Sequence, residues 1–306
     1  LSLHDALPIL KSFRSAPIIL NAVNSLSPVT GSEHLSAAFP SRWGSGGAAG
    51  LASFDNEDCE ATWIAGMSKS ILCHCPHQRI SIITRTGYRA ITVKRTLTQG
   101  GIEYTDWGSG IFRPEVAGVL KHICSDIQAR SFANNLEALR YIQQRASTCH
   151  VSQTEELEEA CGWLFDQLFQ RGFDLSRLHE IEENITVRRG NETIATREGV
   201  HCLTGHAGKG QQFDWVFVLG LEDGTIPYYR AKSPESKREE AKVLSVMISR
   251  ARIGIFGTYT KNDARRFSKQ PSEFIQYLKK APGFLCGKES IEAWCSKADW
   301  PAIASM

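Results

Sequence analysis

The sequence has no apolar run long enough to cross a membrane and no strong excess of charge of either sign. Its longest apolar runs, such as WVFVLGL at 215–221, fall well short of the roughly 20 residues that a membrane-spanning helix needs. Lys and Arg number 35 and Asp and Glu number 33, so the net charge is only +2. This balance excludes a protein that binds polyanions over its whole surface, and a nucleic-acid site would have to be a local patch.

A disulfide framework and a secretory signal are also absent. Nine cysteines, an odd number, are scattered over 306 residues, whereas disulfide frameworks belong to short, cysteine-dense secreted domains. The N-terminal LSLHDALPI has no basic segment before an apolar core, so it is not a secretory signal. We expect a reducing, cytoplasmic location. Residues 1–9 resemble a translated sequencing adapter and are expected to be a non-native leader.

A metal site is not predicted either, although cysteine and histidine gather at CHCPH, residues 73–77. Zinc sites use C-x₂₋₄-C spacing with a second ligand pair at a distance, and Cys73 and Cys75 are too close for that pattern. Cys286 and Cys295 are the pair that could complete such a site. Ordinary reduced cysteines at a helix end are the favoured interpretation.

The chain does contain the patterns of a folded α/β protein. Hydrophobic residues make up 42% and charged residues 22%, close to the globular average. Apolar strands alternate with amphipathic helices, a rhythm that predicts a parallel sheet flanked by helices. The expected helices are 15–26, 56–72, the start of 89–107, 235–252 and a last one from about 271; the expected strands are 79–87, the end of 89–107, 199–206, 214–221 and 253–259, with a loop at 41–50.

Between about 110 and 198 the pattern becomes mainly helical, with no convincing strand pair. We interpret this stretch as a helical insertion into one sheet domain. The sheet domain then has a first part at 10–109 and a second part at 199–281. The tail at 282–306 is left unassigned.

The stretch TGHAGKGQQFD at 204–214 places glycines around a lysine, as in a phosphate-binding loop. A P-loop needs G-x-x-x-x-G-K-[ST], because the hydroxyl group after the lysine binds Mg²⁺. Here Gly210 follows Lys209, and no complete P-loop occurs in the 306 residues. The acids Glu222 and Asp223 end an apolar strand, and they are expected to cap a turn rather than to hold a metal.

Three stretches resemble, in the required order, motifs of UvrD/Rep-type DNA helicases. FRSAPIILNAVNSL at 13–26 is similar to motif IV, with Ser12 and Phe13 in place of Asn and Tyr. EEAKVLSVMISRAR at 239–252 is similar to motif VI, with Ser249 in place of Thr. Between them RISIITRTG has Gly87 where the family has Asn, and PSEFIQYL at 271–278 resembles the closing helix. The motif V positions that coincide are Thr204, His206, Lys209, Gly210, Phe213, Val216, Phe217, Gly220, Leu221, Glu222, Gly224 and Pro227.

The resemblance covers about 10–109 and 199–281 and implies the second of two RecA-like domains that clasp ATP. In that family the first domain carries the P-loop and the acids that hold Mg²⁺, and this chain would supply only the second half of the site. The resemblance assigns catalysis to Arg250, an arginine finger on the γ-phosphate, and to Arg14, its partner. ATP would also contact Phe13, which replaces the tyrosine that stacks on adenine, and Gln212, which replaces a glutamate that touches the ribose.

For DNA, the same resemblance points to His206 and Arg85, with Thr204, Lys209 and Tyr88 as further candidates. It implies that the partners are single-stranded DNA, single-strand/duplex junctions and the N-terminal RecA-like domain. The intact protein would couple ATP hydrolysis to 3′-to-5′ movement and duplex unwinding, and this fragment alone would be inactive. The alternatives are a non-catalytic DNA-binding or partner-docking RecA-like module, and the helicase part of a recombination helicase-nuclease.

Overall fold

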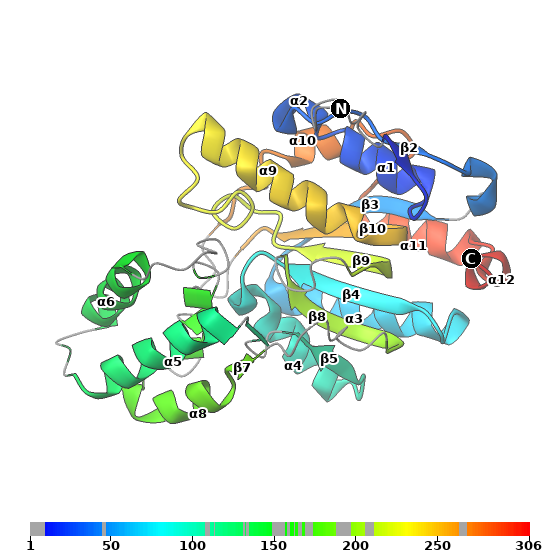
Figure 1. Ribbon diagram of the computed structural model, residues 1–306. Helices are drawn as coiled ribbons and strands as arrows, with labels where there is room; N and C mark the ends of the chain where they lie inside the picture. The colour runs from blue at the N-terminus through cyan, green and yellow to red at the C-terminus, as the bar shows by residue number, and fades with distance from the viewer. Residues whose placement is uncertain are drawn as a thin grey trace, which may run out of the picture.

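The computed structural model describes residues 10–44, 47–107, 111–112, 114–130, 132, 135–148, 157, 160–161, 163–164, 167–168, 174–187, 197–205, 211–262 and 268–306. The predicted leader at 1–9 lies outside these residues. Most of the described chain forms a parallel sheet with helices on both faces (Figure 1).

The sheet has seven strands in the order β11-β3-β10-β9-β4-β8-β5, and every pairing is parallel. All seven residues of the central strand β9 are buried, as expected for a parallel strand covered on both faces. The predicted α/β fold is therefore confirmed. The strands are β3 (Ala48–Phe54), β4 (Arg79–Thr84), β5 (Tyr104–Asp106), β8 (Gly199–Thr204), β9 (Phe213–Leu219), β10 (Ala251–Thr260) and β11 (Leu285–Cys286).

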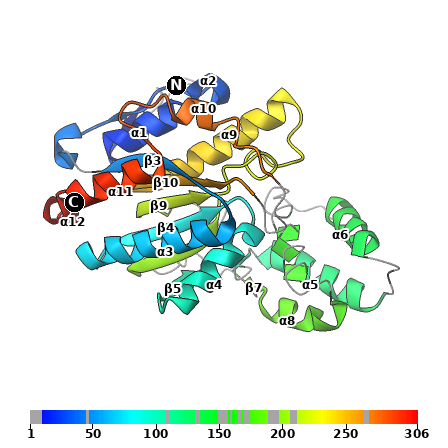
Figure 2. The same cartoon turned by 180° about the vertical axis from the view of Figure 1, so that it is seen from behind.

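Two helix pairs cover the sheet. Helices α1 (Pro17–Asn24) and α9 (Pro234–Ser249) pack together on one face, and α3 (Glu57–His74) and α4 (Ile91–Gln99) lie on the other (Figures 1 and 2). Helix α3 begins where Asn56 accepts a hydrogen bond from the Cys59 N–H, at 2.9 Å, and three acids in its first turn suit the helix dipole. None of the helices within the described residues is long and apolar enough to cross a membrane.

Shorter elements complete the fold. They comprise a parallel ribbon of two strands, each with two residues, and several short helices. These are β1 (Lys11–Ser12), α2 (Ser27–Thr30), β2 (Ser36–Ala37), η2 (Pro40–Trp43), η3 (Gly87–Ala90), α10 (Ile275–Leu278), α11 (Lys288–Lys297) and α12 (Trp300–Ala304).

A second hydrophobic core lies within residues 112–185, separate from the core under the sheet. Its elements are β6 (Ile111–Phe112), α5 (Pro114–Gln128), α6 (Asn135–Thr148), η4 (Leu175–Arg177), α8 (Leu178–Glu183) and β7 (Thr186–Val187). The short parallel pair β6–β7 was not predicted, because two residues carry no periodicity. The exact domain boundaries remain a prediction.

Several sequence-based boundaries are wrong. The loop expected at 41–50 gives way to β3 at Ala48, where Gly50 lets Leu285 and Ile291 approach the backbone. Strand β4 ends at Thr84 rather than 87, and α9 ends at Ser249 because β10 starts at Ala251. The unassigned tail supplies the edge strand β11 and two helices.

Candidate functional site

The motif IV and motif VI segments meet at the amino ends of the central strands. The Ala16 N–H, just before α1, donates a 2.8 Å hydrogen bond to the Arg252 carbonyl in β10. Two residues earlier, the Arg250 carbonyl accepts a 2.9 Å bond from the Phe213 N–H of β9. Arg14 lies two residues before Ala16, and Arg250 lies two residues before Arg252. The hydrogen bond therefore joins two chain segments, 236 residues apart in sequence, at the amino ends of β9 and β10.

Arg250 is the C-cap residue of α9 and is buried, with 5% of its surface exposed. Its Nη2 donates a 3.0 Å hydrogen bond to the carbonyl of Gly205, the residue after β8. Burial lowers the pKa of the Arg250 guanidinium below its usual range, because the charged form loses hydration. The guanidinium therefore lies at the start of the motif V loop.

Arg14 and Phe13 are exposed near this edge. The Arg14 N–H donates a 3.4 Å hydrogen bond to Ser12 Oγ, and the side chain of Arg14 faces solvent. Phe13 is 57% exposed and makes an edge-to-face contact with Phe39 at 5.8 Å between ring centroids. Gln212 is half-buried just before β9, and its carbonyl accepts a 3.0 Å bond from Arg79 Nη1.

At the opposite, carboxyl end of the strands, Arg85 follows β4 directly. Its Nε lies 3.3 and 3.2 Å from the two carboxylate oxygens of Glu240, and its Nη2 donates a 3.0 Å bond to Oε1. The guanidinium also lies 5.4 Å from the centre of the Tyr228 ring. Thr204, the last residue of β8, pairs with Thr84 at the same edge.

Part of the predicted DNA site cannot be placed. His206 and Lys209 lie outside the described residues, and so does the side chain of Tyr88. The structure thus brings Arg85 and Thr204 to one edge and Phe13, Arg14 and Gln212 to the other.

Tyr228 and the two residues that follow it, Tyr229 and Arg230, were missed by the sequence reasoning. Tyr229 is 50% exposed, and its ring lies 4.5 Å from that of Tyr228. The Arg230 guanidinium lies 5.4 Å from the Tyr229 ring, and its Nε donates a 3.0 Å bond to the hydroxyl. The signal was the sequence PYYR, an aromatic pair with an arginine right after the motif V stretch.

Glu222 does not cap a turn with its side chain, as the sequence suggested. A turn does begin there, but it uses the Glu222 backbone carbonyl, which accepts from Thr225 and Ile226. The carboxylate is fully buried; it accepts bonds from Arg89 Nη2 at 2.9 Å and from the Thr260 N–H at 2.8 Å. A strand-end acid that looks exposed in sequence is therefore part of the core.

The CHCPH segment shows no metal-like arrangement, because its side chains point to different neighbours. His74 Nδ1 donates a 2.8 Å hydrogen bond to the Ser70 carbonyl, and the ring stacks on Trp300 with 4.7 Å between ring centroids, while Cys75 is buried. Within the described part of the chain, no three His, Cys, Asp or Glu side chains are grouped so that they could hold a metal ion.

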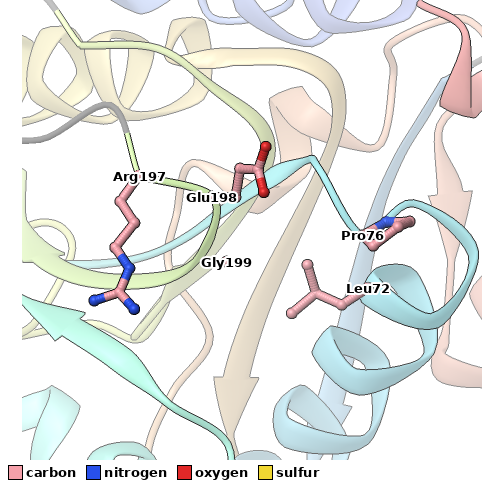
Figure 3. Close-up of a pocket in the computed structure, with 5 residues that line it drawn as sticks. All are labelled: Leu72, Pro76, Arg197, Glu198 and Gly199. Atoms are coloured by element: carbon pink, nitrogen blue, oxygen red, sulfur yellow. The ribbon is translucent and has the colours of Figure 1, made fainter.

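A pocket of about 550 Å³ opens near the amino ends of β4 and β8 (Figure 3). Its lining comprises Leu72, Pro76, Arg197, Glu198 and Gly199, and Figure 3 shows these coming from the end of α3 and the start of β8. None of the predicted site residues lines it, so it plays no part in the candidate site.

Comparison with known proteins identifies the relatives. Residues 126–262 match the family model of the UvrD-like helicase C-terminal domain. The chain carries a UvrD-like helicase C-terminal domain. The resemblance to UvrD/Rep-type DNA helicases is therefore confirmed.

Similar proteins are named as helicases. The ATP-dependent DNA helicase UvrD2 of Mycobacterium tuberculosis is 27% identical over 231 residues, which are 70% of this chain and 33% of the relative. A probable DNA helicase II homolog of Rickettsia felis is 30% identical over 150 residues, 46% of this chain and 23% of the relative. The C-terminal domain of a possible DNA helicase from Lactobacillus plantarum aligns over 90% of this chain and 98% of that chain, at 10% identity and a TM-score of 0.43. The chain spans about a third or less of the length of these curated relatives.

Proposed function

We propose that this UvrD-like domain is the C-terminal motor half of an ATP-dependent DNA helicase that moves 3′ to 5′ on single-stranded DNA. Arg250 and Arg14 contact the γ-phosphate of ATP, Phe13 stacks on the adenine, and Gln212 approaches the ribose. A preceding RecA-like domain supplies the P-loop and the acids that hold Mg²⁺, and the protein works in the cytoplasm. The names of the relatives support the class of activity.

The observation that carries the nucleotide half of this proposal is the Ala16–Arg252 hydrogen bond. It ties the backbone of the segment with Arg14 to that of the segment with Arg250, which supports a common nucleotide site for the two arginines. Phosphoryl transfer is catalysed mainly by positioning and by charge placed where the transition state spreads its own. A guanidinium can donate to two phosphate oxygens at once, which suits both arginines to this task.

Arg250 is also placed so that its hydrogen-bond partner can change. Its Nη2 donates to the neutral Gly205 carbonyl. A phosphate oxygen carries charge and is a stronger acceptor, so ATP can draw the guanidinium away from that carbonyl. Removing an arginine finger lowers turnover by roughly 10³–10⁵ in enzymes of this type.

We assign DNA binding to the surface at the carboxyl ends of the strands. Arg85, Tyr228, Tyr229 and Arg230 combine cationic groups with aromatic rings, and such surfaces hold single strands by phosphate contacts and base stacking. Arg85 is held by the Glu240 carboxylate, so a DNA phosphate has to share or displace this partner. Binding should be tolerant of sequence and weakened by salt.

The nucleotide contacts can be tested on this chain alone. Ligand-observed NMR titrations with ATP, ADP and tripolyphosphate should show tighter binding of ATP than of ADP. Arg14→Ala and Arg250→Ala should remove that difference, whereas Arg177→Ala, which breaks a surface pair with Glu180, should leave it unchanged. If both variants discriminate as the wild type does, the arginines do not face the γ-phosphate, and a non-catalytic docking module becomes the better description.

Hydrolysis provides a separate test. The 306 residues contain no complete P-loop, so the chain alone should release no phosphate from ATP, with or without single-stranded DNA. DNA-stimulated phosphate release by the purified chain would contradict the assignment of the P-loop to a preceding domain.

A further inference from the structure

Exposed large hydrophobic side chains gather at one place on the surface. Among the described residues, three of the five such side chains are Leu10, Phe13 and Phe39, and the latter two are 57% and 59% exposed. All three lie on or directly beside the ribbon of β1 and β2. Exposed apolar groups that cluster in this way usually mark a binding surface.

The ribbon fixes the two rings relative to each other. Strands β1 and β2 pair in parallel, with Lys11 opposite Ser36, and the Ala38 N–H donates a 2.8 Å bond to the Ser12 carbonyl. This bond places Phe39 next to Phe13 although 26 residues separate them in sequence. Phe39 directly precedes η2, whose last residue, Trp43, is buried in the core.

The two rings form an aromatic corner. Their centroids are 5.8 Å apart and their planes meet at 65°, so no flat group fits between them as in a sandwich. A flat heterocycle can instead stack on one ring and direct its edge at the face of the other, the two geometries that aromatic groups prefer. Exposed Lys11 and Arg14 stand beside the corner, which suits a flat group attached to an anion.

We propose that Phe39 is a second aromatic contact for the nucleobase of ATP and contributes to base selectivity. The inference rests on the proposed nucleotide face, in which Phe13 is the stacking residue, and adds a residue that lies outside the motif stretches of this sequence. A purine, with two fused rings, reaches both phenyl groups, whereas a pyrimidine on Phe13 is too small to fill the corner. Phe39 also restricts the orientation of the Phe13 ring before the base binds.

The effect should fall on the base and leave the phosphates alone. An edge-to-face aromatic contact corresponds to about a two- to tenfold change in affinity. Phe39→Ala should therefore weaken ATP binding about two- to tenfold and narrow the preference for ATP over CTP. Binding of tripolyphosphate, which has no base, should not change. Phe39→Trp keeps an aromatic surface and should retain the affinity for ATP.

The test uses ligand-observed NMR titrations of the full chain with ATP, CTP and tripolyphosphate. Val246→Ala, which trims an exposed apolar side chain on the outer face of α9, is the matched control and should behave as the wild type. The expected result is that Phe13→Ala and Phe39→Ala both weaken ATP selectively.

Three outcomes would overturn the inference, and each has a different meaning for the proposed function. If Phe13→Ala weakens ATP and Phe39→Ala does not, Phe39 is absent from the base site while the nucleotide face stands. If ATP binds no tighter than tripolyphosphate, the corner holds no base and serves as a protein contact. If the chain binds neither ligand, the nucleotide face fails as well.

Discussion

Replacing Arg89 with alanine should destabilise the fold strongly, because this arginine neutralises a buried group of carboxylates. Arg89 is 2% exposed, and its Nη2 lies 2.6 Å from Glu60 Oε2 and 2.9 Å from Glu222 Oε1, both on fully buried side chains. Lys269 lies 3.3 Å from a third carboxylate, that of Glu57, and 4.0 Å from Glu222. Without Arg89, three carboxylates would share one lysine at the edge of the group.

The magnitude follows from what the substitution leaves behind. Removing one partner of a buried ion pair costs about 3–5 kcal/mol, since the remaining charge is buried without compensation. The hydrogen bond to the Glu222 carboxylate, at about 1.5–3 kcal/mol, is part of the same loss. We therefore expect about 3–5 kcal/mol, a large share of the 5–15 kcal/mol that typically stabilises a folded protein.

Urea unfolding followed by tryptophan fluorescence measures this loss, because Trp63 and Trp215 are buried in the same core. Arg95→Ala is the matched control: Arg95 also pairs with an acid of α3, Asp58 at 2.7 Å, but both side chains are exposed. Its cost should stay within about 0.5 kcal/mol. Arg89→Lys keeps the charge and should fall between the two. Equal stabilities of the Arg89→Ala and Arg95→Ala variants would refute the reasoning.

Further predictions concern glycine packing and pH. A Cβ at Gly254 would overlap the Trp215 indole, so Gly254→Ala should cost about 1–3 kcal/mol in urea unfolding, whereas Gly66→Ala, in open space on α3, should stabilise by about 0.5–1 kcal/mol. Burial, only partly offset by Arg89, raises the pKa of Glu60 above 4.5. The folded state then retains a proton that the unfolded chain releases, so Glu60 lowers the stability of the fold as the pH rises above 4.5. Glu60→Gln should remove that loss of stability. Burial opposes ionisation of Glu222 too, yet Arg89 and Lys269 lower its pKa below 4.5. The stabilisation from Glu222 is present above pH 4.5 and lost as the pH falls below it. Glu222→Gln should therefore lower the free energy of unfolding at pH 7 and reduce its decline at acid pH.

Each of these predictions has a result that would contradict it. A Gly254→Ala variant as stable as the wild type would mean that the strand can shift away from the indole. Parallel stability profiles of the two glutamine variants from pH 3 to pH 7 would mean that the two glutamates do not differ in ionisation.

The sequence predicted the central strands because their composition leaves little choice. The run WVFVL at 215–219 is apolar throughout, and a short apolar run rich in aromatic and β-branched residues is typical of a strand buried on both faces of a parallel sheet. Strand β3 was missed because AAGLASF is made largely of small residues. Its conformation is set by neighbours far away in sequence, β10 on one side and β11 on the other, which no local pattern reveals.

The candidate site was predictable only where a motif fixed the residue. Arg14 and Arg250 could be named from motif order, but the hydrogen bond between Ala16 and Arg252 that joins their chain segments is visible only in the structure. Phe39 could not be named, because the Ser12–Ala38 contact that brings it beside Phe13 is tertiary. The roles of all these residues stay predictions until binding is measured.

Two buried arginines of this domain, Arg89 and Arg250, differ in the direction in which the pKa of the guanidinium is shifted. For Arg89, burial opposes the charge, but Glu60, Glu222 and Glu57 together raise the pKa of the guanidinium, so the fold itself stabilises the cation. For Arg250, burial lowers the pKa of the guanidinium, which donates to the Gly205 carbonyl. In the proposed function a bound triphosphate contacts Arg250, whereas Arg89 has its carboxylate partners within the fold. Substitution of Arg89 therefore tests the stability of the fold, and substitution of Arg250 tests the proposed contact with the nucleotide.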